Sequence, residues 1–224
     1  MLERILNLIF PLKCIFCGNI LEVSQSKEIC KSCFGKISFT DKNLYHTLLN
    51  KEENNYCDGI VCVCEYSGII KESLITYKFF NKPGHYRTFA HMLSQRLKEM
   101  TDCKGFDIIV SIPLHKKREY IRGYNQSKLI SKALSKQLKI IEASFVLKRV
   151  FDTRTQSLLN RNLRKMNVKG AFRADYKDFI KGKTILLVDD ILTTGNTINE
   201  CCRVLKEAGA KKVFAAVIAT GRKY

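Results

Sequence analysis

The sequence of 224 residues predicts an α/β protein, a parallel sheet flanked by helices, with a small N-terminal module. Three observations support this prediction. Apolar, β-rich runs alternate with segments whose apolar residues recur at helical spacing. The first part of the chain instead has two C-x2-C pairs and little apolar periodicity. With 46% hydrophobic residues, the chain is long enough for one sizeable core and one appended module.

Changes in composition divide the chain into three parts. Residues 1–40 form the loop-rich module, residues 41–58 are polar and are expected to be a linker, and residues 59–224 form the α/β domain. Strands are expected at residues 60–66, 107–112, 184–190 and 213–219, and helices at residues 124–138 and 196–209. The runs IIV and ILLV lack polar alternation, as expected for strands that are buried on both faces.

Four cysteines of the module have the spacing of a tetrahedral metal site. Cys14, Cys17, Cys30 and Cys33 form C-x2-C-x12-C-x2-C, and each C-x2-C turn can aim two thiolates at one ion. A module of this size also needs a bound metal ion or a similar cross-link to fold. We therefore expect a structural zinc and a zinc-ribbon-like module. An iron–sulfur cluster and a redox pair are the alternatives. Of the other cysteines, Cys62, Cys64, Cys201 and Cys202 are interpreted as small buried hydrophobes.

The net charge of +18, from 39 Lys and Arg against 21 Asp and Glu, favours polyanionic ligands such as nucleic acid or polyphosphates. Glu3 and Arg4 interrupt the apolar N-terminal stretch and Pro11 closes it, so we expect no secretion signal. No later segment reaches the length of a membrane span. The expectation is a cytoplasmic protein without membrane insertion, whose cysteines stay reduced.

The stretch ILLVDDILTTGNT, residues 185–197, places two carboxylates directly after a buried strand. Open α/β sheets bind ligands at the carboxyl ends of their strands, where Asp189 and Asp190 lie. Adjacent strand residues point to opposite faces, so both carboxylates can meet one ligand only if the chain turns there, and we expect ILTTGNT to supply the turn. Gly195 allows close backbone approach, and the helix expected from Asn196 adds unpaired N–H donors and a positive dipole end. Hydroxyls come from Thr193, Thr194 and Thr197.

These features suit a ribose 5-phosphate. The two carboxylates can accept hydrogen bonds from vicinal hydroxyls, while residues 193–197 hold the phosphate. The alternative is that Asp190 and the threonines are capping and turn residues of an ordinary strand-to-helix connection. Residues 189–197 contain more such groups than that connection needs, which favours a ligand.

The stretch ILLVDDILTTGNT resembles the phosphoribosyl pyrophosphate motif of type I phosphoribosyltransferases. The resemblance implies that Asp189 and Asp190 hold the 2- and 3-hydroxyls of the ribose, and that residues 193–197 wrap its 5-phosphate. Magnesium would accompany the pyrophosphate. The family often has a second glycine where this chain has Asn196, which also tolerates tight turns.

A second block, VSIPLHKKREYIRGYNQS at residues 110–127, follows another expected strand and is rich in basic side chains. We interpret it as a second anion site, with a solvated basic helix face as the alternative for residues 116–118. The block resembles PLH…R…RGFNQ of the ComF family, in which the Pro-Leu-His turn takes the place of the pyrophosphate loop. Ser111 and Tyr124 depart from the family pattern, where an apolar residue and Phe are more usual. The candidate ligand-binding residues are Pro113, Leu114, His115, Arg122, Asn125 and Gln126.

A third block, residues 154–172, resembles the Q…L…R…N…GAF segment of the ComF family. Because the family also begins with paired cysteines, the resemblance covers nearly the whole chain. The matching residues are Gln156, Leu159, Arg161, Arg164, Asn167, Gly170, Ala171 and Phe172.

The resemblance leaves two functions open. In the first, phosphoribosyl pyrophosphate and magnesium bind at the sheet edge, a nucleophile attacks C1 of the ribose and pyrophosphate leaves; the acceptor is unknown, and whether the chain is an enzyme stays open. In the second, the chain is a non-enzymatic single-stranded DNA-binding protein that works with the competence machinery in DNA uptake. The basic run of residues 161–183 motivates the second function, with Phe172 and Tyr176 as candidate stacking residues.

Overall fold

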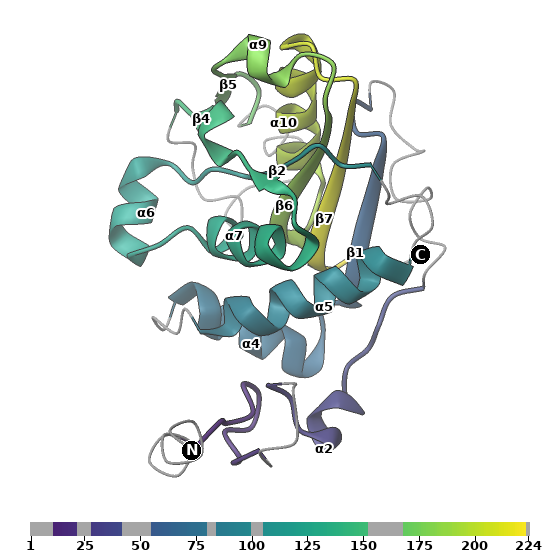
Figure 1. Ribbon diagram of the computed structural model, residues 1–224. Coiled ribbons are helices and arrows are strands. Elements are labelled where there is room, and N and C mark those ends of the chain that lie inside the picture. The colour runs from purple at the N-terminus through teal and green to yellow at the C-terminus, as the bar shows by residue number, and fades with distance from the viewer. Residues whose placement is uncertain are drawn as a thin grey trace, which may run out of the picture.

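A computed structural model describes residues 11–21, 28–41, 55–79, 84–99, 105–151 and 168–222. Five strands form one sheet in the order β1-β7-β6-β2-β3, and every paired neighbour is parallel (Figure 1). A separate two-stranded sheet is antiparallel. The parallel sheet that the sequence predicted is therefore confirmed. The large sheet consists of β1 (Gly59–Glu65), β2 (Ile108–Ser111), β3 (Ile141–Glu142), β6 (Thr184–Leu192) and β7 (Lys212–Thr220), and the small one of β4 (Leu147–Arg149) and β5 (Phe172–Ala174).

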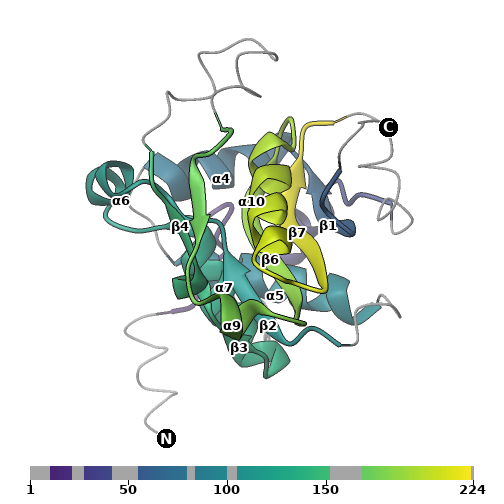
Figure 2. The ribbon, with the colours of Figure 1, turned by 90° about the horizontal axis from the view of Figure 1, so that it is seen from above.

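Helices cover both faces of the large sheet, as Figures 1 and 2 show. Helix α10 and the small sheet lie on one face, and α4, α5 and α7 lie on the other. The helices expected at residues 124–138 and 196–209 are present as α7 and α10. The described helices are α2 (Lys31–Phe34), α4 (Gly68–Phe79), α5 (His85–Glu99), α6 (Lys116–Arg122), α7 (Gln126–Leu138), α9 (Lys177–Ile180) and α10 (Asn196–Glu207), with a 3-10 turn η2 (Ser144–Val146).

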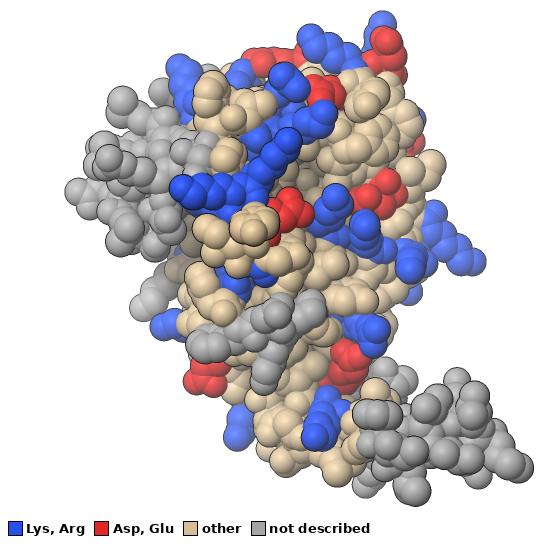
Figure 3. Space-filling model, turned by 90° about the vertical axis from the view of Figure 1, so that its left-hand side faces the viewer, with Lys and Arg blue, Asp and Glu red and all other residues tan. Residues whose placement is uncertain are grey.

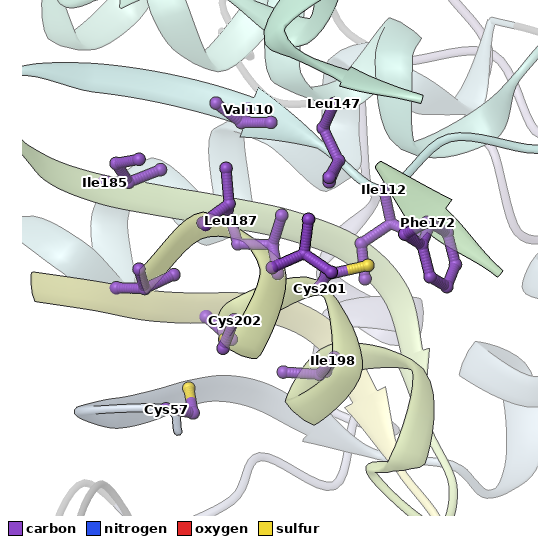
Figure 4. Packing of buried hydrophobic residues seen from close by; sticks show 14 of the residues in the cluster. Cys57, Val110, Ile112, Leu147, Phe172, Ile185, Leu187, Ile198, Cys201 and Cys202 are labelled. Carbon is purple, nitrogen blue, oxygen red and sulfur yellow. The ribbon is translucent and has the colours of Figure 1, made fainter. Parts of the chain in front are cut away.

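Two cysteines outside the N-terminal module are buried in the core on the α10 face of the sheet. Ile185 and Leu187 of β6 point toward α10, where Cys201 and Cys202 are completely buried (Figure 4). Burial raises the pKa of both thiols well above the ordinary value, so they remain neutral at physiological pH. Their interpretation as small buried hydrophobes is confirmed.

The N-terminal module packs on the opposite face, beside the helical layer. Its apolar residues join the core of α4, α5 and α7. Buried Arg96 of α5 donates Nη2 to the carbonyl oxygens of Thr40 (2.8 Å) and Val63 (3.2 Å), and Thr88 donates to Glu28 (2.5 Å). A guanidinium shared between the module and β1 makes the two parts one packed body. The module residues in this core are Cys14, Leu21, Ile29, Cys33 and Ile37.

The end of the expected linker belongs to the packing of the sheet domain. Cys57 is buried in the α10-side core, and Asp58 accepts from the backbone N–H of Val213 (2.6 Å) and pairs with Lys206 (2.7 Å). Residues 42–54 lie outside the described residues. Across the described part of the chain, every helix is too short or too polar to span a bilayer.

Candidate functional site

Two of the predicted blocks meet at the carboxyl edge of the sheet. Strands β2 and β6 are parallel neighbours, with Ser111 beside Val188, and the N–H of Ile112 donates to the carbonyl of Val188 (2.9 Å). Because parallel strands end at the same edge, the segment after β2 and the segment after β6 emerge side by side. The structure therefore brings together residues 112–126 and 189–197.

The chain turns within ILTTGNT, as expected, but the turn begins after Leu192 and not directly after the paired acids. Strand β6 continues to Leu192, and the turn falls on residues 193–195. Ile191 and Leu192 still pair with Ala219 and Thr220 of β7, which satisfies their backbone groups inside the sheet. Beyond Asp190 the alternation of side chains between the two faces of β6 shifts by one residue, because Leu187 and Leu192 both belong to the α10-side core.

Asp189 is held by groups on two segments. Its Oδ1 accepts from Ser127 Oγ at the start of α7 and from the N–H of Asp190, both at 2.9 Å. Burial and, next, the negative charge of Asp190 raise the pKa of Asp189 to about 7, although Lys78 and these two donors act in the opposite direction. The carboxyl group therefore changes its charge close to neutral pH.

Asp190 pairs with a lysine that sequence reasoning missed. Lys78 Nζ of α4 lies 2.9 Å from Asp190 Oδ1, and both side chains are mostly buried. Arg122 also lies within the field of Asp190: burial lowers the pKa of Arg122, and the carboxylate partly offsets this. A lysine near the end of an amphipathic helix ordinarily suggests a solvated position, so no spacing in the sequence pointed to Lys78.

The threonine loop, residues 193–197, leads into α10 without a side-chain cap. Gly195 is the N-cap residue and has φ of 80°, in the left-handed region that favours glycine, and no side chain caps the helix there. The first N–H groups of α10 have no partner inside the helix, and the dipole adds positive potential. The alternative, in which Asp190 or a threonine caps this helix, therefore does not describe α10. Asn196 is the first helical residue and needs no positive φ.

The predicted pyrophosphate block divides into exposed and structural residues. Helix α6 buries none of its residues, and Lys116 and Lys117 are exposed, as the solvated-helix alternative describes. His115 caps α6 by accepting from the N–H of Lys117 (3.4 Å). Pro113, Leu114 and His115 are all half-buried beside the end of β2.

Asn125 and Gln126 are buried, and their side chains face protein groups. Asn125 caps α7 by accepting from the N–H of Lys128 (3.3 Å) and donates to the carbonyl of Ile112 (3.1 Å). Gln126 Oε1 accepts from Arg122 (3.3 Å), while its buried Nε2 has no hydrogen-bond partner among the described residues. Asn125 thus positions the segment after β2, and Gln126 orients Arg122.

Most of the third block lies outside the described residues, including Gln156, Leu159, Arg161, Arg164 and Asn167. Its end is structural. The N–H of Gly170 donates to Glu200 of α10 (2.7 Å), and Phe172 is buried with the Arg149 guanidinium 5.4 Å from its ring centroid. Phe172 is therefore a core residue and Tyr176, which is exposed, is the stacking candidate that remains.

The four module cysteines converge as the spacing predicted. Their ligand atoms all lie within 4.8 Å of one another. Burial raises the pKa of Cys14, but backbone N–H donors such as that of Cys30 outweigh it and bring the pKa to about 6. Burial and the neighbouring thiols raise the pKa of Cys33 to about 12. Four thiolates at this spacing repel one another, and a bound dication removes that repulsion, so the set fits tetrahedral zinc.

Known proteins match this arrangement along the chain. Residues 123–224 match the phosphoribosyl transferase domain family, and residues 5–47 match the double zinc ribbon domain family. The DNA utilization protein YhgH of Escherichia coli strain K12 is 40% identical over 157 residues, covering 69% of this chain and 68% of that protein. Competence protein F of Haemophilus influenzae is 29% identical over 220 residues, covering 91% and 95%. The chain belongs to the ComF family.

The ComF assignment confirms the resemblance found in the motifs, and the zinc ribbon match supports structural zinc at the four cysteines. Among solved structures, the chain is similar to glutamine phosphoribosylpyrophosphate amidotransferase from B. subtilis, with 18% identity, a TM-score of 0.43, and 64% and 30% of the two chains covered. It is also similar to adenine phosphoribosyltransferase from Leishmania donovani, with 11% identity, a TM-score of 0.41, and 76% and 85% covered. The scores are low, so the fold assignment rests on the sheet topology and the family matches.

Replacing Cys33 with Ser should release the metal from the module. We expect the parent protein to hold about one zinc ion per chain at the four cysteines, and the variant to hold much less, because a serine hydroxyl is a poor zinc ligand. Metal content of purified protein is the measurement. Cys201→Ala is the control: it may cost stability in the core, yet its zinc content should equal that of the parent.

The raised pKa of Asp189 should appear in the pH dependence of stability. Because the folded state holds this proton more tightly than the unfolded state, the contribution is present at acid pH and is lost as pH rises from about 3.8 to about 7. Denaturant titrations across this window should show a smaller loss for Asp189→Asn than for the parent. Exposed Asp178→Asn should keep the parent slope; equal slopes in all three proteins would contradict the raised pKa.

Proposed function

We propose that this ComF-family protein binds phosphoribosyl pyrophosphate at the edge formed by β2 and β6, and transfers its phosphoribosyl group to an acceptor. One observation favours this most: Asp189 and Asp190 lie at that edge just before α10, whose N-terminus has no side-chain cap. Hydroxyl groups of a ribose can donate to the carboxylates, while N–H groups of the threonine loop and α10 can donate to the oxygens of a phosphate monoester.

The charges around the acids fit a polyphosphate sugar. Lys78 neutralises Asp190 at 2.9 Å, and Arg122 lies in the field of the same carboxylate. Within the part of the chain that the structure describes, neither cation is ion-paired with a second acid, so both can bind a pyrophosphate beside them. Ionised Asp189 is the better acceptor for a ribose hydroxyl, so binding should strengthen as pH rises through about 7.

Magnesium would accompany the pyrophosphate. The paired carboxylates are hard oxygen ligands of the kind that Mg²⁺ shares with phosphate groups, so Asp189 or Asp190 fits this role, and the ion would supply neutralising charge. In the transfer step, the bond between C1 and the pyrophosphate oxygen breaks while an acceptor atom bonds to C1. Arg122 and Lys78 would stabilise the negative charge that develops on the leaving pyrophosphate.

Removing both carboxylates should abolish donor binding. Phosphoribosyl pyrophosphate with magnesium should raise the melting temperature of the parent protein, because a ligand that binds only the folded state stabilises it. The double variant Asp189→Asn, Asp190→Asn should show little or no shift, and Asp178→Asn should show the parent shift. A parent protein without any shift at millimolar ligand would contradict the proposal. Pyrophosphate release in a screen of nucleobases and amines would then test transfer.

A second candidate function, binding of single-stranded DNA, is favoured by an exposed aromatic pair. Tyr176 and Phe145 are 62% and 51% exposed, and their ring centroids lie 5.3 Å apart at 80°. Phe179 continues the row from Phe145 at 5.5 Å, and Lys183 Nζ lies 5.5 Å from its ring centroid. Tyr176 is the N-cap residue of α9 and has a left-handed φ of 57°, which is uncommon for a tyrosine.

Basic side chains surround this pair. Residues 144–151 and 168–183 contain seven Lys and Arg against two Asp. Cross-strand neighbours Lys148 and Arg173 share Asp175, at 2.6 and 2.9 Å, and together the two cations exceed its charge. Figure 3 shows Lys and Arg side chains spread over the upper half of the adjoining face. Exposed rings among cations suit stacked bases and a phosphate backbone. The relatives named for competence and DNA utilisation agree with a role in DNA uptake.

Replacing Tyr176 with Ala should weaken binding of a dye-labelled oligothymidylate by about tenfold or more without changing the salt dependence, because stacking is lost and no charge changes. Lys177→Gln should instead lower the salt slope by about 0.7. Fluorescence anisotropy at several salt concentrations measures both. Tyr120→Ala, which removes the 90% exposed ring of α6, is the matched control; weakening by this variant and not by Tyr176→Ala would move the contact to α6.

A further inference from the structure

The last residue that the structure describes, Arg222, lies against the threonine loop. Its Nε donates to the carbonyl of Thr193 (2.9 Å), and its Nη2 donates to the carbonyl of Thr194. Two carbonyls of consecutive peptides therefore point at one guanidinium. The planar fork of an arginine suits such paired acceptors, whereas a lysine ammonium on a flexible stem does not hold two of them in a fixed geometry.

Fixing these carbonyls also fixes the N–H groups behind them. A trans peptide is planar, so its C=O and N–H point in opposite directions, and the described residues contain no cis peptide. The peptide of Thr193 has the N–H of Thr194, and the peptide of Thr194 has the N–H of Gly195. When Arg222 holds both carbonyls on its own side, both N–H groups face away from it.

We infer that Arg222 is the positioning residue of the phosphate-binding loop: it holds two successive loop peptides so that their N–H groups are directed at a phosphate monoester. This role rests on the proposed sugar-phosphate site. Arg222 acts through the backbone of residues 193–195 and need not touch the ligand. Without it, the two peptides can rotate, and the loop must be ordered anew for each binding event.

The pairing of β7 with β6 places Arg222 next to the threonine loop. Thr220 of β7 pairs with Leu192 of β6, and the N–H of Gly221 donates to the carbonyl of Leu192 (3.3 Å). Past that pair, both chains leave the sheet together, one as the threonine loop and the other as Gly221 and Arg222. The N–H of Arg222 donates to Thr220 Oγ1 (3.2 Å), which holds the backbone from which the side chain reaches the loop.

Gly195 leaves room for the guanidinium. A Cβ at this position would lie 3.0 Å from Arg222 Nη2, in addition to the strain at φ of 80°. Glycine is therefore favoured here by the positive φ of the turn and, in addition, by the close approach of the arginine. The loop and Arg222 form one unit, although Gly195 and Arg222 are 27 positions apart in the sequence.

The experiment compares two ligands on folded protein of full length. Ribose 5-phosphate requires the threonine loop, whereas inorganic pyrophosphate with magnesium would use the neighbouring segment after β2. Isothermal titration should show ribose 5-phosphate binding weakened about tenfold in Arg222→Ala, the loss expected for charge-assisted hydrogen bonds, with pyrophosphate binding unchanged. Arg222→Lys should lie between the two proteins. Arg87→Ala removes one charge from an exposed position elsewhere and should match the parent with both ligands.

A spectroscopic readout separates positioning from a general loss of charge. In amide NMR spectra of the parent, ribose 5-phosphate should shift the Thr194 and Gly195 N–H resonances; in Arg222→Ala these shifts should be much smaller. If the alanine variant binds ribose 5-phosphate like the parent, the role of Arg222 is overturned while the proposed function stands. If the parent binds neither ribose 5-phosphate nor phosphoribosyl pyrophosphate, the proposed function fails, and this role fails with it. Should Arg222→Ala not fold, Arg222→Lys decides: parent-like affinity and shifts overturn the role.

Discussion

The arrangement of the site depends on the parallel pairing of β6 with its neighbours β7 and β2. This pairing brings three chain segments out at one edge, and each contributes a different chemical group. The end of β6 supplies two acids and the threonine loop, β2 leads to the segment that Asn125 fastens to Ile112, and β7 delivers Arg222. Since buried parallel strands need all their backbone groups paired with each other, the edge is a place where backbone N–H groups become available to a ligand.

Two adjacent acidic side chains can be buried at this edge because each has its own hydrogen-bond or ion-pair partners. Asp189 receives a hydroxyl and a backbone N–H, while Asp190 receives an ammonium from α4. A buried carboxylate without such partners would be protonated or would destabilise the fold. In the proposed function, the hydroxyl groups of a bound sugar phosphate would either replace these hydrogen-bond and ion-pair partners or bind beside them. In the structure Asp190 is ion-paired with Lys78, so a ribose hydroxyl would compete with Lys78 for this carboxylate in the proposed function.

The sequence predicted the features that depend on neighbouring residues, but not the contacts between segments that are far apart in the sequence. The buried strands, helix α10, the glycine turn and the converging cysteines follow from short-range patterns: apolar runs, a φ that only glycine adopts easily, and C-x2-C spacing. The turn within ILTTGNT begins only after Leu192 because β7 extends to Thr220 and keeps Ile191 and Leu192 in the sheet, which no local pattern encodes. Lys78 and Arg222 were missed for the same reason. Each is a lone cation far from the motif in sequence, and only the packing of α4 and β7 places it there.

The net charge of +18 has a simple relation to both proposed functions. Both proposed ligands are polyanions, so both need positive potential. Exposed Lys116 and Lys117 lie in the segment after β2, and the basic residues of 144–151 and 168–183 belong to the small sheet and its flanking segments. The long-range field does not distinguish the two ligands, but the short-range groups do. Stacking requires exposed rings such as Tyr176, and a phosphate monoester requires directed N–H groups such as those that Arg222 fixes in the threonine loop.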